Sequence, residues 1–134
     1  MKWMLMMNVP GAEDYQVPTW TPEEVVAHMG FMHDLNAYLT ETGEYVDGQG
    51  LAAPSQVKVV TSGSDGAPVV TDGPFAEAKE FLAGYWIIET DSAERTYEIA
   101  ARISSAPGPG GAPLHLPIEV REVLSPTVAD DISL

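Results

Sequence analysis

The 134-residue sequence contains no cysteine, and only 6 lysine and arginine residues stand against 20 aspartates and glutamates. Without cysteine there is no disulfide, no thiolate nucleophile and no cysteine-based zinc site. The formal net charge of −14 opposes nucleic-acid binding, because phosphate recognition requires a surface rich in lysine and arginine. The same charge opposes docking on an anionic membrane. We therefore expect neither nucleic acid nor a membrane as a partner.

Long hydrophobic runs are missing as well. The N-terminal segment MKWMLMM is the strongest candidate, but its apolar run ends at Asn8 and Pro10 without a small-residue cleavage site. A secretory signal needs an apolar stretch of roughly 7–15 residues, and a membrane helix needs about 20. We therefore expect residues 3–9 to form a first strand and the protein to be cytoplasmic.

Two helices are predicted from their capping signals. Thr21 suits the N-cap, Pro22 suits the first helical position, and Glu24 completes a capping box. This helix should run to about residue 42 and end at Gly43, because glycine tolerates the left-handed conformation of helix ends. A second capping box, DSAE at residues 91–94, predicts a helix that runs to about residue 104.

Apolar and alternating runs predict the strands, which lie at residues 3–9, 45–46, 56–61, 68–71, 82–89 and 116–123. Two helices are too few to cover both faces of a sheet, so the economical fold is an α+β sandwich of ferredoxin-like type. We expect a mainly antiparallel sheet of about five strands with both helices on one face. One domain should cover residues 1–124, followed by a mobile acidic tail at residues 125–134.

The pattern of two strands bears on assembly. Residues 3–7 and 85–88 are apolar on both of their alternating sets, whereas a strand with one wet face alternates apolar and polar residues. The face without helices should therefore also be buried. We expect a homodimer packed sheet to sheet. The alternative is that the long loops of the same chain fold back over that face.

Several segments resemble one known family. These are VTDGPFAEAKE at residues 70–80, GYWIIE at residues 84–89, TPEE at residues 21–24, and EYVDGQGL at residues 44–51 with Pro54 after it. Together with the opening MKWMLMM they resemble the YCII-related family in its DGPF-type branch, in the right order over residues 1–124. The resemblance implies a dimeric α+β barrel of ferredoxin-like subunits, with small substrates bound in a cleft between sheet and helices.

The resemblance also suggests acid–base chemistry. Some distant YCII-related proteins are small-molecule enzymes, including a dehydrochlorinase, and some carry a helix histidine paired with an aspartate. Counting back from Gly43, that histidine position falls at Met32, one residue before His33. On this basis we take His33 as the candidate general base and Asp72 as its candidate partner. The alternative is that the helix histidines are packing residues, and that Asp72 stabilises a turn.

The remaining candidate site residues come from the DGPF segment and the strand after it. Lys79 is one of three lysines in this acidic chain and could supply a positive charge to an anionic ligand, with Glu80 beside it. Phe75 and Tyr85 are candidates for the apolar lining of a pocket. The alternative for Lys79 and Glu80 is an ordinary solvated surface, and for Phe75 a plug in the core.

No cofactor or metal is expected. His28 and His33 are five residues apart, so they do not share a helix face as a pair of metal ligands would. His28 falls within the apolar stripe of the first helix. We therefore predict a cofactor-independent acid–base enzyme, such as a lyase, isomerase or dehydrochlorinase-like protein, with its cleft near the dimer seam. The alternative is a non-catalytic dimer module that binds a small molecule or has a regulatory role.

Overall fold

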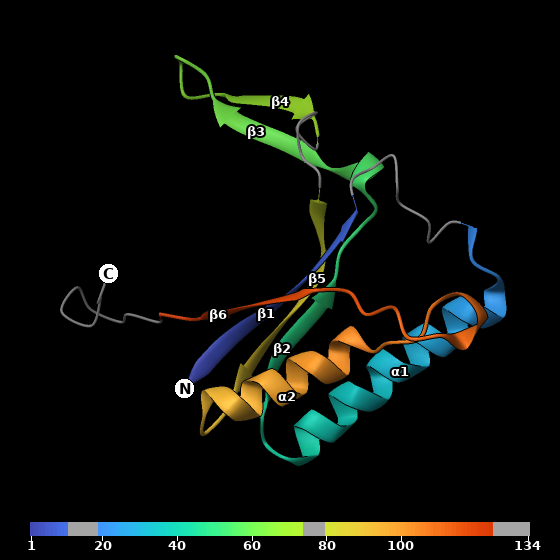
Figure 1. Ribbon diagram of the computed structural model, residues 1–134. Coiled ribbons are helices and arrows are strands. Elements are labelled where there is room, and N and C mark those ends of the chain that lie inside the picture. The colour runs from blue at the N-terminus through green and yellow to red at the C-terminus, as the bar shows by residue number, and fades with distance from the viewer. Residues whose placement is uncertain (11–18, 74–79, 125–134) are drawn as a thin grey trace.

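In the computed structural model, residues 1–10, 19–73 and 80–124 are described (Figure 1). The expected tail, Phe75 and Lys79 lie outside these residues. The elements in chain order are β1 (Lys2–Pro10), α1 (Pro22–Glu41), β2 (Tyr45–Gly50), the short helix η3 (Pro54–Gln56), β3 (Lys58–Ser62), β4 (Pro68–Asp72), β5 (Glu80–Glu89), α2 (Ala93–Ser104), the short helix η4 (Pro109–Gly111) and β6 (Ile118–Glu122).

Four strands form the main sheet in the order β2-β5-β1-β6, and every neighbouring pair is antiparallel. This arrangement confirms the predicted ferredoxin-like α+β fold. The strand count differs from the expected five, because β3 and β4 pair only with each other and form a separate two-stranded sheet. Both edges of β5 are already occupied by β1 and β2, so the hairpin that precedes β5 has no edge of that strand to join. Figure 1 shows the hairpin projecting beyond the end of the main sheet.

The predicted capping signals fix where the helices begin. The Thr21 hydroxyl accepts a hydrogen bond from the Glu24 amide at 3.1 Å, and the Glu24 carboxylate accepts one from the Thr21 amide at 2.8 Å. At α2 the capping box predicted for residues 91–94 does not form: the N-cap is Ser92, and its hydroxyl accepts from the Arg95 amide at 3.1 Å. These bonds satisfy amide groups that have no partner within the helix. No helix within the described ranges is long and apolar enough to cross a membrane.

The core lies between the main sheet and the two helices, which run side by side over one face of it (Figure 1). Alternate residues of β1 and β5 point into it, and Leu5 pairs with Trp86. Arg95 on α2 fastens this layer by donating from Nε and Nη2 to the Glu44 carboxylate at 2.9 and 2.8 Å and from Nη2 to the Tyr38 hydroxyl at 3.0 Å. The buried members of the core are Leu5, Met7, Val9, Leu35, Leu39, Trp86, Ile88, Ile99, Ala100 and Ile103.

The opposite face of the main sheet has mixed chemistry. The strand register places Met4 beside Ile87 and Met6 beside Tyr85 on this face, and these four side chains are partly exposed. On β6 the residues paired with Met4 and Met6 are charged. Among the described residues no helix covers this face, which we call the outer face (Figure 1).

Candidate functional site

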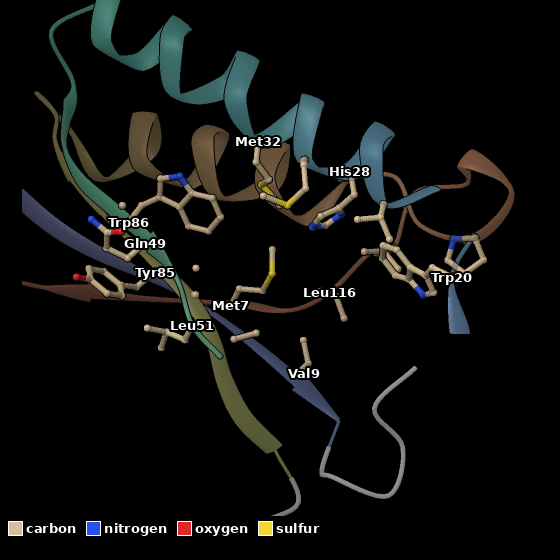
Figure 2. A pocket seen from close by; sticks show the side chains of 18 residues that line it. Met7, Val9, Trp20, His28, Met32, Gln49, Leu51, Tyr85, Trp86 and Leu116 are labelled. Carbon is tan, nitrogen blue, oxygen red and sulfur yellow. The ribbon is translucent and has the colours of Figure 1, made fainter. Parts of the chain in front are cut away.

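A cavity of about 600 Å³ lies between the N-terminal half of α1 and the main sheet (Figure 2). It lies within the 300–1,000 Å³ typical of small-molecule sites. Among the residues that the structure describes, no aspartate, glutamate, lysine or arginine lines it. The lining residues come from β1, α1, β2, β5 and the segments around them, and they are Met7, Val9, Trp20, Val25, His28, Met29, Met32, Gly48, Gln49, Gly50, Leu51, Ala83, Gly84, Tyr85, Trp86, Pro109, Leu114 and Leu116.

Small residues on β2 and β5 leave the space empty. The cavity is lined there by Gly48, Gly50, Ala83 and Gly84, so main chain forms part of its floor. At Gly84 the two strands approach so closely that an added Cβ would lie 3.1 Å from the carbonyl oxygen of Gln49. Larger side chains on these strands would fill the cavity as they fill the rest of the core.

The walls combine a fixed aromatic ring with flexible thioethers. The indole Nε1 of Trp86 donates to the Asn36 side-chain oxygen at 2.8 Å, which holds the ring against the cavity. Met7 and Met32 supply adaptable apolar surface. Two other lining residues are unusually exposed for their type, since Met29 is 58% and Leu51 is 46% exposed. Exposed apolar side chains at the rim are typical of a site that is open to ligands.

His28 is the histidine of this cavity, which it enters from α1 (Figure 2). Its Nδ1 lies 3.0 Å from the backbone oxygen of Pro107. A carbonyl oxygen only accepts hydrogen bonds, so Nδ1 must carry the proton and donate it. The Trp20 ring packs edge-on against the imidazole, with 5.4 Å between ring centroids and 74° between ring planes. The ring is therefore fixed in both orientation and tautomer.

A loop from the far end of the chain closes one end of the cavity. Residues 107–114 contribute Pro109 and Leu114 to its lining. The Glu24 carboxylate accepts a hydrogen bond from the Gly110 amide at 2.5 Å. The bonds from the Thr21 and Gly110 amides lower the pKa of the Glu24 carboxyl, because they favour its charged form.

The structure distributes the sequence-predicted site residues over several places. His33 lies on α1 with its side chain exposed and outside the cavity lining. Asp72 lies on β4, where its side chain is 87% exposed and pairs with Lys58. The structure brings neither residue into the cavity, and their catalytic role stays a prediction. Glu80 is exposed at the start of β5.

Tyr85 is among the residues that line the cavity, but its ring points away from the cavity in Figure 2, and its role in ligand binding stays a prediction. Its hydroxyl donates to the Asp47 carboxylate at 3.1 Å, and Gln49 donates to the other oxygen of the same carboxylate at 3.2 Å. The hydrogen bond to Asp47 raises the pKa of the Tyr85 hydroxyl, because the neutral phenol is the donor. This cluster lies at the sheet edge where the cavity and the outer face meet.

Sequence reasoning placed His28 in the apolar stripe but chose His33 as the functional histidine. The stripe was the available signal, since His28 lies three residues after Val25 and four before Met32. The contact with Pro107 joins positions 79 apart in the chain, and nothing in the local pattern predicts it. Within the described residues, no three histidine, aspartate or glutamate side chains gather in a group that could hold a metal ion.

A comparison with protein families matches the YCII-related domain over residues 1–110, which includes β1, α1, the cavity floor and part of the loop that closes it. No curated protein matches the chain.

Proposed function

This chain belongs to the YCII-related family, and within that family we propose that it serves as a receptor for a small, uncharged and largely apolar molecule. The observation that carries the proposal is the cavity of about 600 Å³ with its apolar walls. Burial of apolar surface is the dominant favourable contribution to binding in such a site. The family membership is compatible with this role and does not decide between binding and catalysis.

The charge of the ligand follows from the lining. Moving an ion out of water is costly unless an opposite charge or several hydrogen bonds compensate for it. The cavity lining offers no charged side chain among the described residues, while the whole chain carries −14. An anion would also be repelled by the acidic surface. A neutral ligand avoids both costs.

The proposal is tested by titrating naphthalene into the protein and following side-chain methyl signals by NMR. We expect saturable shifts at the methyl groups of Met7, Met32 and Leu116. Leu51→Asp adds a negative charge at the rim and should weaken binding at least threefold. Val46→Asp is the matched control, because Val46 is 48% exposed, close to the 46% of Leu51, and does not line the cavity. If naphthalene does not shift the methyl signals of the cavity residues, the proposal is refuted.

The outer face is proposed to pack against the same face of a second copy, forming a homodimer of the α+β barrel type. Met4, Met6 and Ile87 support this, because they make a partly exposed apolar centre on a sheet face that no described helix covers. Sedimentation of the wild type should give about twice the monomer mass, and Met6→Asp should give the monomer. A wild-type monomer at micromolar concentration would refute the dimer.

Residues 70–75, VTDGPF, support placement in the DGPF-type branch.

An acid–base enzyme is the second candidate, favoured by the fixed tautomer of His28 inside the cavity. Proton removal from a neutral carbon acid needs a positioned base and no cofactor. In D2O the enzyme should then accelerate exchange of the α-protons of 1-indanone. Loss of the acceleration in His28→Gln would identify His28 as the base, and loss in His33→Gln would identify His33. Exchange at the buffer rate in the wild type would favour binding alone.

A further inference from the structure

The second ring nitrogen of His28 has a defined chemical state. Because Nδ1 donates its hydrogen to the Pro107 carbonyl at 3.0 Å, a neutral imidazole leaves Nε2 without a hydrogen and with a lone pair. Nε2 is then a hydrogen-bond acceptor and cannot donate. The edge-on contact with Trp20 and the bond to Pro107 oppose rotation of the ring that would exchange the two nitrogens.

Nε2 has no hydrogen-bond partner in the part of the chain that the structure describes. Within residues 1–10, 19–73 and 80–124 no group hydrogen-bonds Nε2 of His28. The nearby lining from α1 is Val25, Met29 and Met32, which offer no hydrogen-bond donor. An acceptor enclosed by a ligand and left unpaired costs free energy, whereas a ligand that donates to it avoids that cost.

We infer that the cavity selects, among apolar molecules of suitable size, those that carry one neutral O–H or N–H group, which donates to Nε2 of His28. This inference rests on the proposed receptor function and specifies its ligand class. A ligand with only acceptor groups, such as an ether or a ketone, would face the lone pair of Nε2 and gain nothing from it. His28 is thus the specificity-determining residue of the cavity.

The test uses two isomers of equal size. 3-Methylindole has an N–H donor, and 1-methylindole has a methyl group on that nitrogen. We expect the wild type to bind 3-methylindole about 3- to 10-fold more tightly, which is the effect of one hydrogen bond. His28→Phe keeps a ring but has no acceptor, so it should bind both isomers equally. Ala37→Phe, at an exposed position of α1 outside the cavity, should keep the wild-type preference.

A direct measurement keeps the inference testable if His28→Phe does not fold. The ¹⁵N signals of His28 in the wild type should show a protonated Nδ1 and an unprotonated Nε2, and 3-methylindole should shift the Nε2 signal more than 1-methylindole does. Equal affinity of the wild type for both isomers, or a proton on Nε2, would overturn the inference. If naphthalene binds and the two isomers bind equally, the receptor function stands and only the inference about the ligand class is refuted. If none of the three ligands binds, both the receptor function and the inference are refuted.

Discussion

Glu24 and His28 lie one helical turn apart on α1 and hold the same distant loop by opposite kinds of hydrogen bond. The Glu24 carboxylate accepts from the Gly110 amide, and His28 Nδ1 donates to the Pro107 oxygen at 3.0 Å. Both contacts reach a segment that also lines the cavity through Pro109 and Leu114. The position of this loop and the tautomer of the cavity histidine are therefore linked.

The first prediction concerns Glu24. Glu24→Gln keeps one side-chain oxygen for the capping box but presents an NH2 group where the second oxygen accepted from Gly110. We expect faster hydrogen exchange at the Gly110 amide, with α1 still formed. Thr21→Ala is the complementary control, because it removes the hydroxyl that caps the helix and leaves the Gly110 contact in place. It should lower the free energy of unfolding by about 1 kcal/mol without faster exchange at Gly110.

The second prediction concerns acid stability. Hydrogen bonds from Arg95 lower the pKa of the Glu44 carboxyl below its ordinary value of 4.5, against the opposing effect of burial. A carboxyl with a lowered pKa in the folded state contributes stability that is complete above its unfolded pKa and is lost as the pH falls through its folded pKa. Urea unfolding should therefore show a loss of stability below about pH 4.5.

Glu44→Gln is the variant that checks this assignment. It should be less stable than the wild type near neutral pH, and its stability should fall less steeply on acidification. Glu98→Gln is the control, because Glu98 also pairs with Arg95, at 3.2 Å, but is an exposed partner. An identical pH profile for wild type and Glu44→Gln would contradict the prediction.

The third prediction concerns the partner of Glu44. Arg95→Met removes the hydrogen bonds to the Glu44 carboxylate and to Tyr38 and leaves the largely buried carboxylate without its cation. We expect the free energy of unfolding to fall by about 2–3 kcal/mol, the range for hydrogen bonds that involve charged groups. Chemical denaturation measures it. A change below about 0.5 kcal/mol would place this contact among ordinary surface pairs.

The fourth prediction concerns Gly108. A Cβ at this position would lie 2.4 Å from Cδ2 and 2.9 Å from Cγ of Leu114, so Leu114 must move. Gly108→Ala should destabilise the fold by about 1–3 kcal/mol and change naphthalene affinity, because Leu114 lines the cavity. Gly50→Ala is the matched control for stability, since nothing lies within 4 Å of a Cβ added at Gly50. Equal losses of stability in the two variants would contradict the steric explanation.

Much of the fold could be predicted because its signals are local. The capping box predicted at Thr21 is present, and α1 begins at Pro22 as expected. The second helix also begins where it was predicted, at Ala93, but its N-cap is Ser92, which bonds Arg95 instead of forming the predicted capping box of residues 91–94. Strand patterns gave the element order and the ferredoxin-like class. The separate β3–β4 sheet was not predicted, because pattern identifies a strand but not the edge to which it pairs.

The candidate site was less predictable, because its decisive contacts join distant segments. Residues 107–113 are rich in glycine and proline, and only the folded chain shows that carbonyl and amide groups of this segment meet α1. Helical periodicity put His28 among apolar residues, which is equally true of a packing histidine. Which of the two helix histidines faces a cavity depends on where the small residues of β2 and β5 leave space.

Part of the floor of that space is main chain, whereas most cores are bounded by side chains on every side. At Gly48, Gly50 and Gly84 the depth of the cavity depends on the absence of side chains. A methyl group at one of these positions would therefore change the size of the ligand that fits. A relative with a bulky residue at the position of Gly50, where nothing lies within 4 Å of an added Cβ, would keep the fold and lose cavity volume. Sequence divergence on these two strands should therefore track what each protein accommodates more closely than divergence on the helices.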